Sequence, residues 1–171
     1  VLPHMRERKS GCIINISSVG GRVFNHFSAP YSASKAAIEA FSECLAMEVL
    51  PFGIRVAVVE PGVIDTPLQD KARSGIRETR YPNLQRSVAF FSAATDHHVP
   101  PQVVAEVVNN IVNGGSRQFR NPAGPDSKPA MDMRNAVSDE DWIASAAVDE
   151  ETWIKMMESM QLNVRKYLNA R

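Results

Sequence analysis

Two short apolar runs on either side of one long helical pattern limit most strongly how this chain of 171 residues can fold. Residues 12–16 and 54–60 are rich in β-branched side chains and stop at serine or proline, which is typical of buried strands in a parallel sheet. Residues 30–50 between them are mostly strong helix formers. A strand, a helix and a second strand with short links form a βαβ unit. We therefore predict an α/β fold built on a parallel sheet.

The helix expected over residues 30–50 has a wide apolar face. Its members recur at helical spacing and are Ala33, Ala37, Ala40, Phe41, Cys44 and Met47, extended by Ile38 and Leu45. The two cysteines of the chain, Cys12 and Cys44, lie in apolar, regular segments without metal-ligand spacing. We expect both to be buried, reduced core residues, which suits the cytoplasm.

Weaker patterns cover the remainder of the chain. Residues 64–99 are polar and irregular, so they form either a lid over a pocket or a pair of ordinary surface helices. The predicted division is a domain over residues 1–120, which includes this substrate lid region, and a linker with a C-terminal helical extension over 121–171. The other expected elements are a helix end over 1–9, a helix over 101–113, a short edge strand at 118–120, a loop or linker over 121–135 and a helix over 149–169 with a packing stripe of Trp and Met.

The composition excludes several classes of partner. Lys and Arg total 19, as do Asp and Glu, so no net charge favours nucleic acid or an anionic membrane. No apolar run approaches the roughly 18 residues of a membrane span, and we expect a cytoplasmic protein.

His97 and His98 are adjacent, and neighbouring side chains seldom point together, so we expect a solvated loop pair and no metal site.

Tyr31 and Lys35 stand four residues apart at the start of the long helix, which places them on one face with their β-carbons about 5–6 Å apart. A free tyrosine has a pKa of about 10 and is almost never ionised at neutral pH. A nearby ammonium favours the phenolate, and so does a hydroxyl that donates a hydrogen bond to it. Ser18 follows the strand at 12–16 and offers such a hydroxyl. This set suits general acid–base work on an alcohol or a carbonyl, although a Tyr–Lys pair alone occurs by chance in many helices.

Ser18 and Pro61-Gly62 each follow a predicted strand. The carboxyl ends of adjacent strands in an open α/β sheet form the edge where ligands bind. We therefore expect these residues to lie at one site.

Three motifs stand in the order and spacing of one known family. They are Ile14-Asn15-Ile16-Ser17-Ser18, Tyr31-x-x-x-Lys35 and Pro61-Gly62-Val63-Ile64-Asp65-Thr66. Over roughly residues 1–115 the chain resembles the short-chain dehydrogenase/reductases. The resemblance implies a Rossmann-like, doubly wound parallel sheet, of which this chain holds the C-terminal portion.

The resemblance implies three catalytic residues. Ser18 resembles the serine that hydrogen-bonds the substrate oxygen, with Ser17 as its competitor, and Tyr31 resembles the general acid or base. Lys35 resembles the residue that makes this tyrosine more acidic and holds the ribose of a nicotinamide cofactor. The cofactor-binding residues implied in the same way are Tyr31, Lys35, Pro61, Gly62, Ile64 and Thr66. Thr66 is alternatively only a helix N-cap, or serves both roles.

The chain also departs from the family's pattern. The Gly-rich turn that binds a pyrophosphate has no counterpart, because Gly20-Gly21 follows the wrong strand. The residue that selects NAD or NADP and the helix asparagine of the family's proton relay are also missing. Val1 is not a usual start. We therefore expect a fragment that binds NAD or NADP weakly or not at all by itself.

These features together predict an NAD(P)-dependent oxidoreductase that interconverts a secondary alcohol and a ketone. Its substrate is a small alcohol or carbonyl compound, and Phe24, Phe27, Phe90 and Phe91 favour an apolar one, although core packing explains scattered Phe equally well. The alternative is an inactive, truncated remnant that acts as a scaffold or binds a partner. Epimerase or dehydratase chemistry is a weaker third reading. By the resemblance, the full-length protein is expected to be a homo-oligomer that pairs its long helices.

Overall fold

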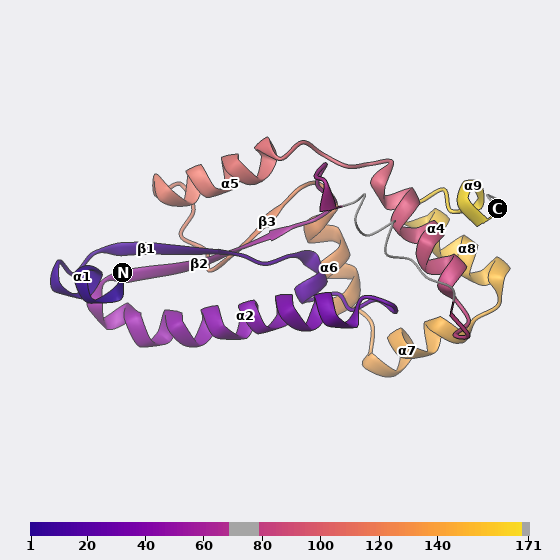
Figure 1. The fold of residues 1–171 in the computed structure, drawn as a ribbon, viewed down its shortest axis with the longest axis horizontal. Coiled ribbons are helices and arrows are strands. Elements are labelled where there is room, and N and C mark those ends of the chain that lie inside the picture. Colours follow the sequence, from indigo (N-terminus) through magenta and orange to yellow (C-terminus); the bar gives the residue numbers. More distant parts are fainter. Residues whose placement is uncertain (69–78, 169–171) are drawn as a thin grey trace. The chain divides into compact units, whose positions relative to one another are not determined.

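Three parallel strands form the sheet in the computed structural model (Figure 1). β2 (Ile54–Pro61) lies between β1 (Gly11–Ile16) and β3 (Arg120–Ala123). The helix α2 (Ala29–Val49) connects β1 to β2. The predicted α/β fold and its βαβ unit are therefore confirmed, as a partial Rossmann-like sheet.

The structure describes residues 1–68 and 79–168, and the chain forms two compact units. The first unit comprises Val1–Gly62 and Pro101–Met131, and the second comprises Val63–Pro100 and Asp132–Arg171. The first contains the whole sheet, whereas the second contains helices. The expected division into residues 1–120 and 121–171 stays a prediction.

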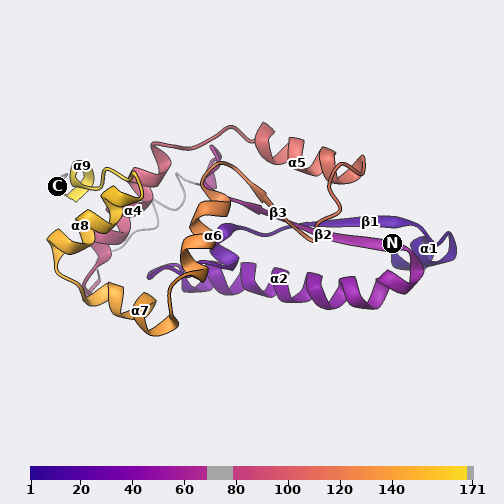
Figure 2. The same ribbon diagram turned by 180° about the vertical axis from the view of Figure 1, so that it is seen from behind.

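Helices cover both faces of the sheet in the first unit (Figures 1 and 2). On one face, α5 (Gln102–Val112) buries Ile111 in a cluster with Val59 of β2. On the other face, Val49 at the end of α2 packs in a cluster with Val56. Alternate residues of β2 thus serve opposite faces, as the two-residue period of a strand requires. The remaining elements of this unit are α1 (Leu2–Glu7), the 3-10 turns η1 (Val19–Gly21) and η2 (Leu50–Phe52), and the start of α6 (Ser127–Asn135).

The apolar face predicted on α2 lies at the surface. Phe41 is 63% exposed and Met47 is 65% exposed. The buried side of the helix is largely polar because it meets polar partners: the Asn15 amide of β1 donates a hydrogen bond of 2.8 Å to Ser42 Oγ. The buried residues of α2 are Ser32, Glu39, Ser42 and Val49, while Ala33, Ala37, Ala40 and Cys44 are exposed with Phe41 and Met47.

The structure contradicts two expectations of burial. Cys44 is exposed and Cys12 is half-buried, so the prediction of two buried cysteines is wrong for Cys44, although both thiols are free. β1 is half-buried along its length, and Ile16 is 41% exposed. Among the described residues β1 pairs with β2 alone, whereas β2 pairs on both sides and is buried.

The segment 121–135 is not a loop. It contains most of β3 and then α6. β3 tolerates Pro122 because it is an edge strand among the described residues, where a missing N–H is harmless. β3 begins at Arg120, so the strand expected at 118–120 overlaps it only at its last residue. The predicted helices at residues 1–9 and 101–113 are confirmed as α1 and α5.

The second unit is a small helical assembly. The C-terminal helix expected over 149–169 is divided, since the backbone turns at Gln161 with a φ of 62°. Trp153, Met157 and Val164 are buried in one cluster with Ala89 and Ala93, so most of the predicted stripe packs, whereas its member Met156 is exposed. Among the described residues, the helices of this unit are the end of α6, α4 (Leu84–Thr95), α7 (Asp139–Ala144), α8 (Glu150–Ser159) and α9 (Arg165–Leu168), with the 3-10 turn η3 (Ser145–Ala147).

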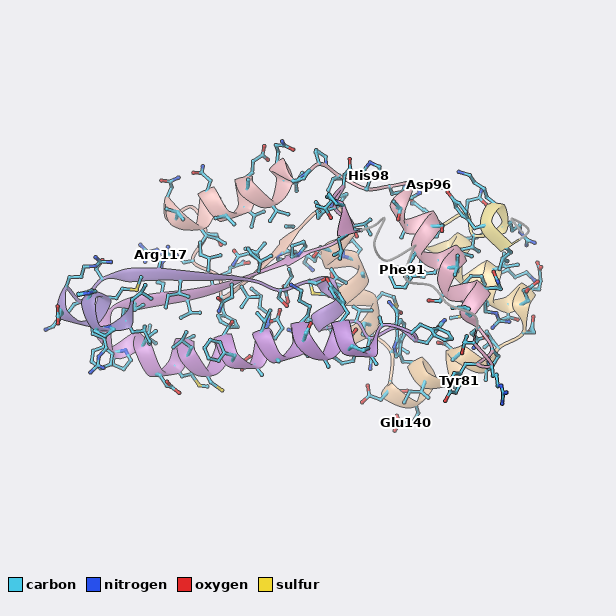
Figure 3. All side chains as sticks on the ribbon, in the orientation of Figure 1. Tyr81, Phe91, Asp96, His98, Arg117 and Glu140 are labelled. Carbon is cyan, nitrogen blue, oxygen red and sulfur yellow. The ribbon has the colours of Figure 1, made fainter. Side chains whose placement is uncertain are left out.

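Asp96, at the end of α4 (Figure 3), ties α9 to this assembly. Its carboxylate accepts a hydrogen bond of 2.6 Å from the Tyr167 hydroxyl and one of 3.2 Å from Lys166 Nζ. These contacts lower the pKa of Asp96 below its usual value, the Tyr167 hydrogen bond contributing most. No helix within residues 1–68 and 79–168 has the length and apolar character needed to cross a bilayer.

Met157 and Met156 offer a matched test of the second unit's core, since they are 8% and 38% exposed. Met157→Ala is expected to lower the free energy of unfolding by roughly 2–5 kcal/mol, because it leaves a cavity in the buried cluster. Met156→Ala is expected to cost less than about 1 kcal/mol. Urea denaturation followed by tryptophan fluorescence measures both, and equal losses would contradict the packing described.

Candidate active site

Ser18 lies just beyond the carboxyl end of β1. Its backbone is extended and its Oγ caps the turn η1, accepting a hydrogen bond of 3.1 Å from the Gly20 N–H. The same hydroxyl donates a long hydrogen bond of 3.5 Å to the carbonyl oxygen of Pro61. Ser18 and the end of β2 therefore meet at one edge of the sheet, as the sequence predicted.

Tyr31 lies in the first turn of α2 with its ring over Gly20. A β-carbon added at Gly20 would lie 2.8 Å from Cε1 of Tyr31 and 3.6 Å from Ser18 Oγ. The glycine thus lets the phenol ring approach the turn that carries the serine. Tyr31 is 39% exposed, so solvent or a ligand reaches it.

Lys35 is half-buried and turned toward the end of β1. Its Nζ donates a hydrogen bond of 3.2 Å to the Ile16 carbonyl and lies 5.9 Å from the centre of the Tyr31 ring. The backbone around it is close-packed, because a β-carbon at Gly21 would lie 3.1 Å from the carbonyl oxygen of Lys35. The ammonium is therefore held beside the phenol by the neighbouring strand and turn.

Ser17 has a structural position that separates it from Ser18. It is 2% exposed, and its Oγ donates a hydrogen bond of 3.3 Å to the Lys35 carbonyl. Ser17 therefore joins β1 to α2, whereas Ser18 is half-buried beside Tyr31.

Pro61 and Gly62 end β2 next to β3. The Gly62 N–H donates a hydrogen bond of 2.9 Å to the Ala123 carbonyl. A β-carbon at Gly62 would lie 2.2 Å from the carboxyl oxygens of Asp126, so a larger residue here would have to displace that side chain. Of the other expected cofactor residues, Ile64 and Thr66 belong to the second unit, where Ile64 is buried and bridges to Val99. The helix that Thr66 would cap falls mainly on residues outside the described ones.

The histidine pair lies in the second unit, and Figure 3 labels His98 after α4. His98 Nε2 is 3.6 Å from Asp65 Oδ2, and both side chains are exposed. No group of three or more metal-ligating side chains exists among the described residues. The expectation of an exposed loop pair matches this arrangement.

The groups gathered at the sheet edge suit a nicotinamide nucleoside and a carbonyl substrate. A lysine ammonium has three N–H donors, one of which points at Ile16, and such donors bind ribose hydroxyls. A serine hydroxyl and a phenol side by side bind one substrate oxygen. Gly20 and Gly62 leave room for the side chains of Tyr31 and Asp126 at this edge.

Known proteins resemble this chain in sequence and in fold. A family model described as short chain dehydrogenase matches residues 1–77. The 3-ketodihydrosphingosine reductase of Bacteroides thetaiotaomicron is 36% identical over 129 residues, which are 73% of this chain and 48% of the relative.

The chain belongs to the short-chain dehydrogenase/reductase family.

Solved structures of the family give the same result. A short-chain dehydrogenase from Streptomyces avermitilis aligns with a TM-score of 0.63 at 27% identity, covering 94% of this chain and 55% of that one. A variant of the actinorhodin polyketide ketoreductase with NADPH aligns with a TM-score of 0.53 at 32% identity, over 69% of this chain and 47% of that one. This chain thus spans about half the length of these relatives.

Sequence reasoning missed two features around this family motif. Gly20 supports the Tyr31 ring, and only the doubled glycine after Ser18 hinted at it. Glu39 and Glu60 are both buried; Glu39 follows Lys35 by one helical turn, and Glu60 is the charged residue of an otherwise apolar strand end. A charged residue at either position was the sequence signal that could have predicted these buried carboxyl groups.

Gly20→Ala tests the contact under the Tyr31 ring. The new methyl group is expected to displace the ring, because 2.8 Å is too short for a carbon–carbon contact. Aromatic NMR signals of Tyr31 should shift, while those of Tyr81 and Tyr167 in the second unit stay in place. Unchanged Tyr31 signals would show that the ring does not lie over Gly20.

Proposed function

We propose that this chain carries the catalytic side of an NAD(P)-dependent oxidoreductase that interconverts a secondary alcohol and a ketone. The observation that supports this most is that Ser18 and Tyr31 meet at Gly20, at the carboxyl edge of the sheet, with Lys35 Nζ 5.9 Å from the centre of the Tyr31 ring. Each of the three offers the type of donor that the reaction requires. The family is one of oxidoreductases, and the relatives of this chain include a 3-ketodihydrosphingosine reductase.

In the reducing direction Ser18 Oγ donates a hydrogen bond to the substrate carbonyl oxygen and orients it. The Tyr31 hydroxyl donates its proton to that oxygen as the carbon receives a hydride. Lys35 stabilises the resulting phenolate through its positive charge. When bound, the nicotinamide supplies or accepts the hydride, which no side chain can do. In the oxidising direction the Tyr31 phenolate takes the proton from the alcohol.

The cofactor in this proposal is NAD or NADP. Lys35, with the help of Tyr31, would hold the ribose hydroxyls. Pro61 and Gly62 would let the chain run close to the nicotinamide ring. Ile64 and Thr66 would bind its carboxamide. A family neighbour solved with NADPH supports a nicotinamide cofactor without deciding between the two. Residues 64–99 serve as the substrate lid, of which 69–78 lie outside the described residues. We place the protein in the cytoplasm, where its two free thiols stay reduced.

The direct test is Tyr31→Phe in the full-length protein. Removing the hydroxyl is expected to lower hydride transfer by roughly 10²–10⁴-fold, the contribution typical of a general acid. Nicotinamide absorbance follows the reaction with a panel of secondary alcohols and ketones. Tyr81→Phe, at a side chain that is 76% exposed, is the matched control and should keep its rate. Hydride transfer near the wild-type rate in Tyr31→Phe would rule out the acid–base role.

A second candidate function rests on the exposed apolar face of α2. Phe41 and Met47 are 63% and 65% exposed, which is unusual for large apolar side chains on one helix and marks an interaction surface. In an active enzyme this face pairs with a second copy of the chain, giving a homo-oligomer. In an inactive remnant the same face would make the chain a scaffold or partner-binding piece. Turnover with a nicotinamide cofactor distinguishes the two.

The oligomer proposal is tested by placing charge on this face. Phe41→Glu combined with Met47→Glu is expected to shift the protein to a monomer, because buried carboxylates would oppose the contact. Val112→Glu on α5, at an equally exposed apolar position of 59%, is the control and should stay assembled. Light scattering measures both masses. A wild-type monomer, or an equal loss of mass in both variants, would contradict pairing through α2.

A further inference from the structure

Two carboxyl groups that the proposed reaction does not use lie buried next to its residues. Glu60 is 1% exposed and directly precedes Pro61, and Glu39 is 4% exposed and follows Lys35 by one turn of α2. Buried carboxylates without full compensation are rare because desolvating a charge is costly. Both carboxyl groups lie beside the candidate active site, so their contacts bear on how its residues are held.

One guanidinium connects these carboxyl groups. Arg120 Nε donates a hydrogen bond of 3.1 Å to Glu39 Oε2 and lies 3.9 Å from Glu60 Oε1. Arg120 Nη2 donates a hydrogen bond of 2.6 Å to Glu43 Oε2. Arg120 comes from β3, so it joins the last strand of the sheet to α2 and to β2. Burial lowers the pKa of Arg120, but the hydrogen bonds to Glu43 and Glu39 outweigh it and raise the pKa above its ordinary value.

The charges around Glu60 do not balance. Arg22, which follows η1, has its Nη1 3.9 Å from Glu60 Oε1. α2 contributes Glu39 and Glu43, and β3 contributes Arg120. Three carboxylates thus share two guanidinium groups, although Glu43 is 54% exposed and contacts Arg120 from the surface. Ser127 at the start of α6 donates a hydrogen bond of 2.6 Å to the Glu60 carbonyl.

Two carboxyl oxygens lack hydrogen bonds within the described chain. Glu39 Oε1 and Glu60 Oε1 are buried and have no hydrogen-bond partner there. A carboxylate can only accept hydrogen bonds, whereas a protonated carboxyl has an O–H to donate. One proton would therefore remove the excess negative charge and convert one of these oxygens into a donor.

The electrostatic surroundings of Glu60 also favour its protonated form. Burial raises its pKa above the ordinary value, the negative charge of Glu39 raises it further, and Arg22 and Arg120 oppose both effects.

We propose that Glu39 and Glu60 hold one proton between them at neutral pH and that this pair, clamped by Arg120, positions the turn of α2 that carries Tyr31 and Lys35. The positioning part rests on the proposed function, whereas the shared proton does not. Glu39 shares its helix face with Lys35, and Glu60 adjoins Pro61, whose carbonyl accepts the Ser18 hydrogen bond. These residues act through Tyr31 and Lys35 and are positioning residues.

Glu60→Gln and Arg120→Met distinguish a protonated pair from an ionised one. A glutamine replaces a neutral carboxyl with little change, so Glu60→Gln should unfold within about 2 °C of the wild type at neutral pH. Arg120→Met leaves Glu39 without its hydrogen-bonded cation and removes one of the two guanidinium groups near Glu60, so it should unfold at a clearly lower temperature. Adding Glu39→Gln to Arg120→Met should restore part of that loss. If Glu60→Gln is as damaging as Arg120→Met, Glu60 is ionised and the proposal is wrong.

Infrared spectroscopy detects the proton directly. The wild type should show the carbonyl band of a protonated carboxylic acid at neutral pH, and Glu60→Gln or Glu39→Gln should weaken or remove it. Glu48→Gln, at an exposed carboxylate on the same helix, should leave the band unchanged. A wild-type spectrum without such a band overturns the shared proton.

The pH dependence has a definite sign. Because the folded pKa of Glu60 is raised from 4.5, the folded chain holds the proton more tightly than the unfolded chain. The free energy of unfolding should therefore fall as pH rises from 4.5 through the folded pKa. Glu60→Gln should flatten this decline, while Glu48→Gln should keep it. A decline of equal slope in both variants would contradict a proton on the pair.

Hydrogen exchange tests the positioning role without relying on turnover. In Arg120→Met, exchange should rise at the amides of residues 31–36 and at Gly20 and Gly21 more than in the α5 side of the sheet. A uniform rise would show a merely global loss of stability and would overturn the positioning role. In an active protein, Arg120→Met should also shift the pH profile of kcat. If the wild type shows no turnover, the proposed oxidoreductase fails while the infrared and exchange results still decide this inference.

Discussion

The pairing of β1 with β2 is the interaction on which the rest of the first unit depends. The two strands run parallel in a register from Gly11 opposite Ile54 to Ile16 opposite Val59, and the Ser17 N–H extends it with a hydrogen bond of 2.8 Å to the Val59 carbonyl. A shift by one residue would turn every side chain to the opposite face. The register therefore places Ser18 beside Pro61 and, through η1, Gly20 under the ring of Tyr31.

Polar contacts fix how α2 lies on this pair of strands. Asn15 binds Ser42, Ser17 binds the Lys35 carbonyl, and Lys35 binds the Ile16 carbonyl. Apolar contacts are tolerant of small shifts along a helix, whereas buried hydrogen bonds are directional and costly to break. The helix that carries the phenol and the ammonium is thus held at one height above the sheet. Its apolar side remains at the surface as a consequence.

The sequence predicted the elements whose signals are local. The apolar run at 54–60 and the helix formers at 30–50 gave β2 and α2, and the four-residue spacing gave Tyr31 and Lys35 on one face. The buried side of α2 could not be predicted, because Glu39 finds its partner Arg120 at a distance of 81 positions along the chain. The edge strand was predicted too early, at 118–120, and α6 was missed. Prolines at 122 and 129 argue against strand and helix unless the edge position and the first helical turn are known.

The separation of the segments along the chain also decides which charges meet only in the completed sheet. β1 pairs with β2 across 43 positions and needs no part of β3. β2 pairs Val58 with Arg120, 62 positions later, and this strand brings Arg120 to Glu39, 81 positions away. Without β3, Glu39 and Glu60 would lack this guanidinium, and burying both carboxylates would be costly. Under the proposal above, docking of β3 would therefore couple proton uptake to completion of the sheet.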